Sequence, residues 1–216
     1  MKVLIIPVTP FEQNCSLLIC EETGKAAAID PGGNLERVEA ALAGHQAELE
    51  KVFLTHGHID HCGQSRVLAD RHHVPLEGPQ LADLFWIKQL PQQANMFGFE
   101  PIAAFEPDRW LEDGDTVTFG AQTLEVLHCP GHTPGHVVFF HRAGGLAIVG
   151  DVLFQGSIGR TDFPGSNHAA LINAITTKLW PLGDDVQFVP GHGPTSTFGE
   201  EREHNAFVSD RALRRG

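Results

Sequence analysis

The sequence predicts one domain of mixed α/β structure, spanning residues 1–216, in which short strands alternate with a few helices. Three observations lead to this class. The chain is long enough to bury a substantial core, and it contains no internal repeat, low-complexity tract or linker rich in serine and glycine. Short apolar runs are followed by glycine or proline, which is typical of strands that end in loops. Residues 169–179 place apolar side chains at helical spacing.

Residues 2–7 form the first apolar run, and Pro7 ends it. The run is too short for the apolar core of a signal peptide, and no apolar run in the sequence approaches the length that spans a membrane. The cysteines form no C-x-x-C pair and are interpreted as reduced thiols. We therefore expect a cytoplasmic protein that has no membrane partner. The cysteines are Cys15, Cys20, Cys62 and Cys129.

The next part of the chain predicts two buried strands and a helix. Residues 26–29 read as a strand, and the D-P-G-G sequence that begins at Asp30 is a strong turn signal. Residues 51–55 predict a second strand, and residues 63–73 predict a helix. The run T-H-G-H-I-D-H at 55–61 is therefore a loop between a strand and a helix, which are rigid anchors for a site.

Four side chains that bind metals lie within this run, namely His56, His58, Asp60 and His61. Imidazole binds borderline cations while it is neutral, and the aspartate adds a carboxylate. Such closely spaced side chains can hardly close around one ion, so two ions that share the run are the simpler interpretation. Nitrogen and oxygen donors without cysteine suit zinc, iron or manganese in a site with open positions, as catalysis requires. The alternative is that these histidines cap a helix or lie on the surface, which fits a lone histidine better than four dense donors.

A second candidate loop is C-P-G-H-T-P-G-H at 129–136, which follows the predicted strand 123–127. His132 and His136 have the spacing of two ligands on a helix. The Pro-Gly pair between them disfavours a helix, so we expect one of the two histidines to reach the metal.

Two further donors stand at the ends of apolar strands. Asp151 follows the predicted strand 146–150, although a simple turn aspartate is the alternative for this residue taken alone. His192 follows the predicted strand 186–190 and a glycine. A strand followed by glycine or proline and then by a donor thus recurs along the chain.

The charge balance excludes one class of partner. The chain has 15 lysines and arginines against 27 aspartates and glutamates, for a formal net charge of −12. A protein that binds RNA or DNA needs a basic surface that neutralises phosphates, so we expect no nucleic-acid partner. Aromatic residues in the stretch 80–101, including Trp86, either cover a cleft or belong to the core.

These motifs resemble those of the metallo-β-lactamase superfamily, and the chain is most similar to its short bacterial glyoxalase II-like members. The sequence G-S-I-G-R-T-D-F-P at 156–164 supports that subgroup, and the resemblance extends from about residue 6 to about residue 205. It implies an αβ/βα sandwich, in which two mostly antiparallel sheets lie back to back with helices outside and the metals at one edge. The motifs are T-H-x-H-x-D-H at 55–61, P-G-H-T-P-G-H at 130–136, V-G-D at 149–151 and P-G-H-G at 190–193.

The resemblance implies a binuclear site of two divalent ions, for which we expect zinc, with iron and manganese as alternatives. One ion would be held by His56, His58 and His132, the other by Asp60, His61 and His192, and Asp151 would bridge them. Asp60 would also orient the metal-bridging hydroxide that attacks a substrate carbonyl.

Two residues are expected behind the ligands. The resemblance suggests that Asp30 lies beneath the metals and orients a ligand, which is compatible with its place in a turn. Cys62 directly follows a ligand and is either a supporting group or a small buried residue.

The resemblance further implies a hydrolase that cleaves S-D-lactoylglutathione, or a related acylthiol, to a hydroxy acid and a thiol, as in methylglyoxal detoxification. A thioester suits the sequence because a thiol leaves without a proton donor, and the chain has no tyrosine to act as one. Two-domain glyoxalase II enzymes carry basic glutathione contacts on a C-terminal helical domain, which we expect this chain to lack. Arg160, Lys88 and Arg202 are candidate substitutes, each with an ordinary ion pair as the alternative. A monomer is expected.

Two other functions stay open. Persulfide dioxygenases of the same superfamily resemble the chain in the 55–61 run and the G-R-T-D-F segment, and use one iron held by the equivalents of His56, His132 and Asp151. A protein that binds metal or acylthiol without catalysis is the third possibility, against which the complete donor set argues.

Overall fold

Two sheets form the centre of the structure, a computed structural model that describes residues 1–214. In the first sheet the strands follow the chain in order, with antiparallel pairing from β1 to β3 and parallel pairing from β3 to β5. They are β1 (Lys2–Val8), β2 (Gln13–Ile19), β3 (Lys25–Ile29), β4 (Glu48–Phe53) and β5 (Leu76–Glu77).

The second sheet has the order β13-β12-β9-β8-β7-β6, and its pairs are antiparallel except for β12 beside β9. A separate hairpin of β10 (Leu153–Phe154) and β11 (Ser157–Ile158) follows β9. The strands of this sheet are β6 (Thr116–Phe119), β7 (Gln122–His128), β8 (Val137–His141), β9 (Leu146–Gly150), β12 (Gln187–Pro190) and β13 (Ser196–Thr197).

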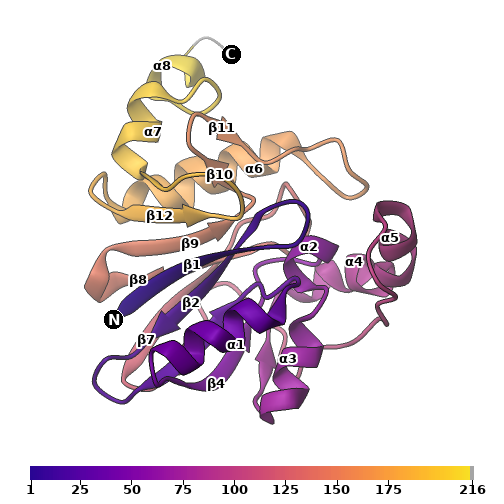
Figure 1. The fold of residues 1–216 in the computed structure, drawn as a ribbon. Coiled ribbons are helices and arrows are strands. Elements are labelled where there is room, and N and C mark those ends of the chain that lie inside the picture. Colours follow the sequence, from indigo (N-terminus) through magenta and orange to yellow (C-terminus); the bar gives the residue numbers. More distant parts are fainter. Residues whose placement is uncertain (215–216) are drawn as a thin grey trace.

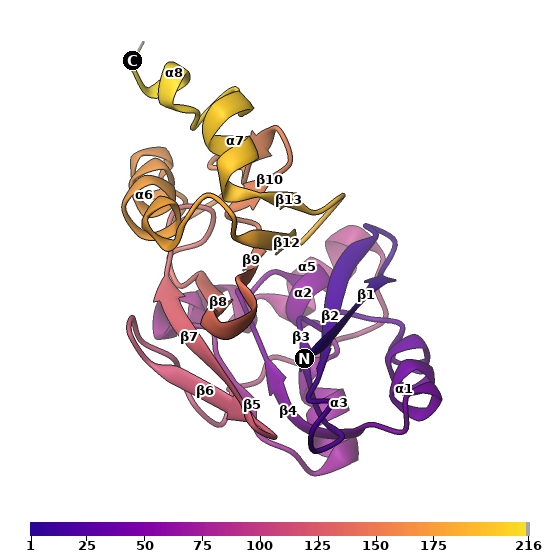
Figure 2. The same ribbon diagram turned by 90° about the vertical axis from the view of Figure 1, so that its left-hand side faces the viewer.

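Helices cover the two outer faces of this pair of sheets. Figure 1 and Figure 2 show α1 and α3 against the first sheet, and α6 and α7 against the second. Among the described residues, no helix is both long enough and apolar enough to cross a lipid bilayer. The helices are α1 (Leu35–Gly44), α2 (Ile59–Cys62), α3 (Ser65–His72), α4 (Leu84–Lys88), α5 (Leu90–Phe97), α6 (His168–Ala174), α7 (Phe198–His204) and α8 (Asp210–Leu213).

The core has three layers that match this arrangement. Between the sheets, Phe53 of β4 packs on Phe139 of β8 with ring centroids 5.4 Å apart. A second cluster joins the outer face of the first sheet to α1 and α3, and a third joins the outer face of the second sheet to α6 and α7. Burying one such phenylalanine stabilises the fold by roughly 1.5–3 kcal/mol, so the interior contacts hold the sheets in fixed positions.

The predicted sandwich of sheets and helices is confirmed, but the pairing is more mixed than expected. The parallel pairs are β3 with β4, β4 with β5, and β9 with β12. Since β7 and β9 both run antiparallel to β8, strands β7, β9 and β12 point the same way. The loops that follow these strands therefore meet at one edge of the second sheet.

Candidate metal centre

The donor side chains come from loops that follow strands in both sheets. The 55–61 run follows β4, and its second half forms the short helix α2. His132 lies in the loop after β7, Asp151 directly follows β9, and His192 lies in the loop after β12. Residues separated by more than a hundred positions are thus brought to one edge of the sandwich.

The first group of donors consists of three histidine nitrogens that face one another. His58 Nδ1 lies 3.1 Å from His56 Nε2 and 3.0 Å from His132 Nε2. Ligands about 2.0–2.1 Å from a tetrahedral zinc ion are about 3.3–3.4 Å apart, which is close to these separations. The lone pairs of the three nitrogens can therefore bind one cation together.

The second group consists of Asp60, His61 and His192, whose ligand atoms also lie close enough together to hold one ion. Asp60 Oδ2 is 3.1 Å from His192 Nε2 and 3.7 Å from His61 Nε2. The side chain of His192 is 30% exposed, whereas that of His61 is fully buried. The second group is therefore the more accessible side of the centre.

Asp151 lies between the two groups. Its Oδ1 is 3.3 Å from His61 Nε2, and its Oδ2 is 3.5 Å from His132 Nε2 and 3.8 Å from His192 Nε2. One carboxylate thus faces ligands of both groups, which is the position a bridging ligand requires.

Hydrogen bonds fix which nitrogen of each imidazole is free to bind a metal. His61 Nδ1 donates to Asp30 Oδ2 at 2.9 Å, and His132 Nδ1 donates to the main-chain oxygen of Arg160 at 2.9 Å. His192 Nδ1 donates to the oxygen of Phe11 at 3.1 Å. In each case the other ring nitrogen, Nε2, is directed at the centre, as expected when a second group orients a metal-binding histidine.

Asp30 supports more than one ligand. Its Oδ1 accepts the Thr55 main-chain N–H at 2.7 Å, and its Oδ2 accepts the Thr55 hydroxyl at 2.6 Å. Since that hydroxyl donates to Asp30, its oxygen accepts from His56 Nδ1 at 3.0 Å. Asp30 adopts a left-handed backbone conformation with φ 55°, a strained geometry for a residue other than glycine.

Unpartnered atoms provide a test of whether the residues fit metal ions. His61 Nε2 and Asp151 Oδ1 are buried and have no hydrogen-bond partner. Leaving such atoms buried and unpaired is costly, and a bound cation would satisfy both. The donor set fits divalent ions of the zinc, iron or manganese type.

The electrostatics differ between the donors. Although burial acts to lower it, the carboxylates of Asp151 and Asp60 raise the pKa of His61 well above its usual value, so a metal that binds there must displace a proton. Burial, together with neighbouring histidines, lowers the pKa of His56 well below its usual value. Burial and the nearby His132 lower the pKa of His58 to about 3. Although burial acts to raise the pKa of Asp151, His61 and His132 hold it well below the usual value. The imidazoles of His56 and His58 are therefore neutral and the Asp151 carboxylate is ionised at neutral pH.

Comparison with known proteins agrees with this geometry. A model of the metallo-beta-lactamase superfamily matches residues 8–192. The hydroxyacylglutathione hydrolase GloC of Haemophilus influenzae is 44% identical over 213 residues, which cover 98% of this chain and all of that protein. The chain belongs to the metallo-beta-lactamase superfamily. The resemblance found in the sequence motifs is thereby confirmed.

Solved structures of the superfamily have the same fold. The B3 metallo-beta-lactamase BLEG-1 superposes with a TM-score of 0.87 and 33% identity, covering 96% of this chain and 99% of its own. The protein TTHA1623, solved in a di-iron-bound form, superposes with a TM-score of 0.86 and 33% identity, covering 95% of this chain and all of its own. The αβ/βα arrangement of the metallo-beta-lactamase domain is thus shown by both sequence and structure.

The three basic residues considered for substrate binding lie in different places in this metallo-beta-lactamase domain. Arg160 is exposed, forms a bidentate ion pair with Asp162, and has its main-chain oxygen bonded to His132. Lys88 is exposed at the end of α4. Arg202 lies on α7 and pairs with Asp184 and Asp210.

Cys62 and His136 are buried near the metal ligands. Cys62 belongs to the apolar cluster beneath α1 and α3, and burial raises the pKa of its thiol well above the usual value. His136 lies behind the centre, where its ring stacks on His56 with centroids 4.6 Å apart and its Nε2 accepts the N–H of Asp151 at 3.0 Å. His132 therefore faces the other donors, while His136 holds the main chain of Asp151.

Sequence reasoning missed Asp83, whose buried carboxylate bonds to both loops that carry the first group of donors. The sequence signal at this position is an acidic residue just before a helix, which is typical of a cap. The side chain makes no capping bond to α4, so that signal predicts the wrong role.

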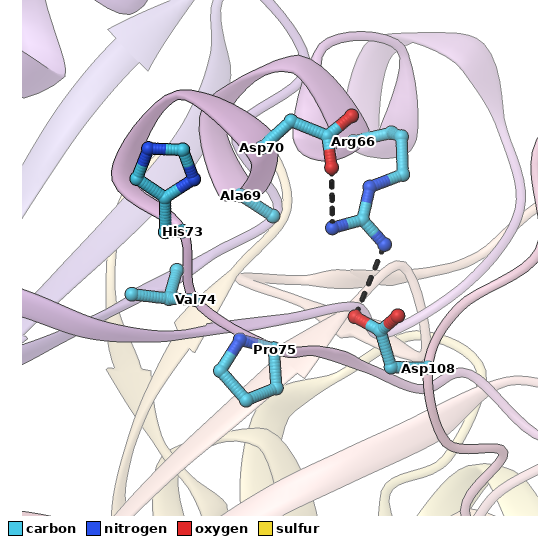
Figure 3. Close-up of a pocket in the computed structure, with 7 residues that line it drawn as sticks. All are labelled: Arg66, Ala69, Asp70, His73, Val74, Pro75 and Asp108. Carbon is cyan, nitrogen blue, oxygen red and sulfur yellow. Dashed lines mark hydrogen bonds and ion pairs between the residues drawn. The ribbon is translucent and has the colours of Figure 1, made fainter.

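A surface hollow beside α3 carries no comparable chemistry. Figure 3 shows that Arg66 spans it and pairs with Asp70 and Asp108. The one cationic side chain of this ion-pair network is thus already held by two carboxylates. The metal centre is therefore the stronger candidate for function in this metallo-beta-lactamase domain.

Proposed function

We propose that the protein is a metal-dependent thioester hydrolase that cleaves S-D-lactoylglutathione, or a related acylthiol, to a hydroxy acid and a thiol. The observation that carries this proposal is the full donor set, in a chain 44% identical to a protein named hydroxyacylglutathione hydrolase. That similarity extends over nearly the whole of both chains, which supports a shared class of substrate.

The proposed ligand assignment follows the two groups of donors. His56, His58 and His132 would hold one divalent ion, and Asp60, His61 and His192 would hold the other, with Asp151 bound to both. Two ions bound in this way would lower the pKa of a shared water and polarise a substrate carbonyl. Asp60 lies on the more exposed side, so its carboxylate is suited to orient the attacking water as well as to bind.

Among carbonyl substrates, a thioester requires the fewest catalytic groups besides the metal ligands. A thiol has a pKa of about 8.5 and leaves as a thiolate without a proton donor, whereas an amine or alcohol needs one. The chain has no tyrosine, and the walls beside the first group of donors are Trp86 and Phe163, whose rings pack on His58 with centroid distances of 4.5 and 5.2 Å. These apolar walls favour an acyl or thiol group over a highly charged one.

Arg160 is the basic residue that we propose for contact with a substrate carboxylate. Its guanidinium lies 4.5 Å from the centroid of the Phe163 ring, and that ring is 5.8 Å from the ring of His132. The ion pair with Asp162 orients the guanidinium without burying it. Lys88 and Arg202 have no contact of this kind with the walls of the centre, and Arg202 already has two acidic partners.

The test is S-D-lactoylglutathione hydrolysis, followed by loss of thioester absorbance, with protein of measured metal content. We expect saturable turnover that falls at least about a hundredfold in His58→Ala, since removing a ligand costs more than removing a group behind one. His204→Ala, which changes an exposed histidine on α7, should match the unmodified protein. Full turnover in His58→Ala, or no thioester turnover at two metals per chain, would rule out the assignment.

A second candidate is oxidation of a persulfide by an iron form of the protein. The observation that favours it is the similarity to a protein solved in a di-iron-bound form, which supports iron as a metal this fold accepts. His56, His132 and Asp151, the donors of a mononuclear iron site, lie together in the centre. Oxygen consumption with glutathione persulfide by the iron-loaded protein tests this candidate, and its absence would eliminate it.

A further inference from the structure

The residue Asp83 stands outside both loops that carry the first group of donors, yet its carboxylate lies between them. It ends the 3-10 turn Leu81–Asp83, just before α4, and it is completely buried. A buried carboxylate costs free energy unless its oxygens are well bonded. Its partners therefore indicate what the fold gains by burying it.

Three donors point at the two oxygens of Asp83. Its Oδ2 accepts the main-chain N–H of Gly57 at 2.8 Å and the hydroxyl of Thr133 at 2.8 Å. Its Oδ1 accepts the main-chain N–H of Gly135 at 2.5 Å. Gly57 is the residue between His56 and His58, and Thr133 directly follows His132. One side chain thus binds the main chain of one ligand loop and both the side chain and main chain of the other.

The main chain of the same turn also packs on both loops. Gln80 N–H donates to the oxygen of Gly135 at 3.0 Å. A Cβ at Gly135 would overlap Gln80 O and Asp83 N, and a Cβ at Gly57 would come within 3.1 Å of Asp83 O. Both loops approach the turn as closely as glycine allows, so neither can shift to replace a lost contact with Asp83.

No basic side chain bonds to Asp83 among the residues that the structure describes. Its three partners are two main-chain N–H groups and a hydroxyl. The two N–H groups can only donate, so each needs an acceptor oxygen on its own side of the carboxyl group. An asparagine offers one oxygen and would turn its NH2 toward one of these donors. The role requires a carboxylate with both oxygens available.

We propose that Asp83 is a positioning residue that holds the His56–His58 loop and the His132 loop at the separation which one metal ion requires. The inference rests on the binuclear centre proposed above but not on the choice of substrate. Asp83 does not contact the ion or the reacting atoms, and acts through Gly57, Thr133 and Gly135.

The test is metal binding by Asp83→Asn, which keeps the shape of the side chain. We expect the unmodified protein to retain two zinc ions per chain after dialysis against a weak chelator, and Asp83→Asn to retain one. In cobalt(II) titrations followed by visible absorption, the affinity of the first group should fall roughly 10–100-fold, as is usual when a group behind a ligand is lost. The midpoint for the second group should stay unchanged.

Double variants identify the group that is affected. In His192→Ala, which damages the second group, adding Asp83→Asn should abolish retention of the remaining ion. In His58→Ala, which damages the first group, adding Asp83→Asn should change little. Equal effects in both backgrounds would overturn the proposal, because a general loss of stability would weaken both groups alike.

Glu201→Gln is the matched control. Glu201 is also a buried carboxylate that accepts from a main-chain N–H, a hydroxyl and an amide, at Gly156, Ser196 and Asn205, but it lies on α7. It should lower the thermal midpoint without lowering metal content. Two ions retained by Asp83→Asn with unchanged affinity would refute the proposal, whereas fewer than two ions in the unmodified protein would refute the binuclear centre instead.

Thr133→Val provides a milder version of the same test if Asp83→Asn does not fold. It removes one of the three bonds and keeps the carboxylate. We expect a smaller loss of cobalt affinity, confined to the first group. An unchanged affinity in a folded Thr133→Val protein would count against the positioning role.

Discussion

At the scale of single residues, the centre depends on imidazoles that stay neutral while packed against one another. His56, His58 and His132 have ring centroids within 5.1 Å of each other, so a proton on any one would repel charge on the others. Burial adds to this effect. Protonating one of these histidines in the folded protein therefore costs free energy, and this cost can be measured in the metal-free form.

We expect the contribution of His58 to the stability of the metal-free protein to be lost as the pH falls below about 6.5, whereas the raised pKa of His61 acts in the opposite direction. The pKa of His58 is about 3 in the folded state and about 6.5 in the unfolded chain, so the unfolded state binds the proton first. The contribution of His58 to the free energy of unfolding is complete above its pKa in the unfolded chain. It falls by up to about 1.4 kcal/mol per pH unit as the pH drops from about 6.5 to about 3. Chemical denaturation at several pH values measures it.

His58→Asn is the comparison for this prediction, since it removes the titrating group but keeps a polar side chain. The free energy of unfolding of the variant should depend less steeply on pH between about 6.5 and 3. Equal slopes for the two proteins would show that His58 does not carry the effect.

The donors could be proposed from sequence because they carry their own chemistry, and the motif resemblance assigned them to groups. Residue chemistry alone could not choose between His132 and His136, since both lie in one loop and both are buried. The choice depends on which ring faces His58 and which lies under the main chain of Asp151. Asp83 escaped prediction because its partners are distant in sequence and two of them are main-chain groups, which no residue pattern reveals.

At the scale of elements, each donor follows a strand in a loop that has little room. Gly191 illustrates this in the loop after β12. A Cβ at this position would overlap Asp151 Oδ1 and crowd His61 Cε1. The glycine lets the main chain pass directly beside the carboxylate that faces both groups of donors.

Gly191→Ala should therefore impair metal binding without unfolding the protein. The added methyl group would displace the Asp151 carboxylate, so we expect fewer than two zinc ions per chain by elemental analysis and a loss of hydrolase activity. Gly44→Ala is the control, because a Cβ at that position on α1 meets no atom within 4 Å. Normal zinc content in Gly191→Ala would contradict the packing described here.

Element positions were predicted well where a strand was buried, as for β7, β9 and β12, and less well at element ends. The strand predicted at 51–55 is β4 (Glu48–Phe53), because the N–H of Thr55 leaves the sheet and bonds to Asp30. The helix predicted at 63–73 is shortened to α3 (Ser65–His72). Tertiary contacts determine where these elements end, and local sequence patterns do not reveal those contacts.

At the scale of the whole molecule, the centre joins the two sheets. His61 follows a strand of the first sheet, and Asp151 and His192 follow strands of the second. A metal held by all three bonds the halves of the sandwich to each other. The order of strands in each sheet was beyond the sequence, because pairing between distant strands depends on the complete fold, and the resemblance supplied only the sandwich of two sheets.

Removing metal should lower the thermal midpoint of the protein. A ligand present at a hundred times its dissociation constant stabilises the folded state by about 2.7 kcal/mol, and for a chain of this size each kcal/mol shifts the midpoint by roughly 2–4 °C. We expect a chelator to lower the midpoint by roughly 5–10 °C, and added zinc to restore it. Calorimetry with His204→Ala and His192→Ala should show the full shift in the first variant and a smaller one in the second.

The order of the donors along the chain matters while the protein is being made. His56, His58, Asp60 and His61 leave the ribosome long before His132, Asp151 and His192 exist. During this interval the early donors cannot form a complete group, because each group also includes His132 or His192. The first group can be complete once the loop after β7 exists, whereas the second must wait for the loop after β12, so the second group is the last part of the centre to form.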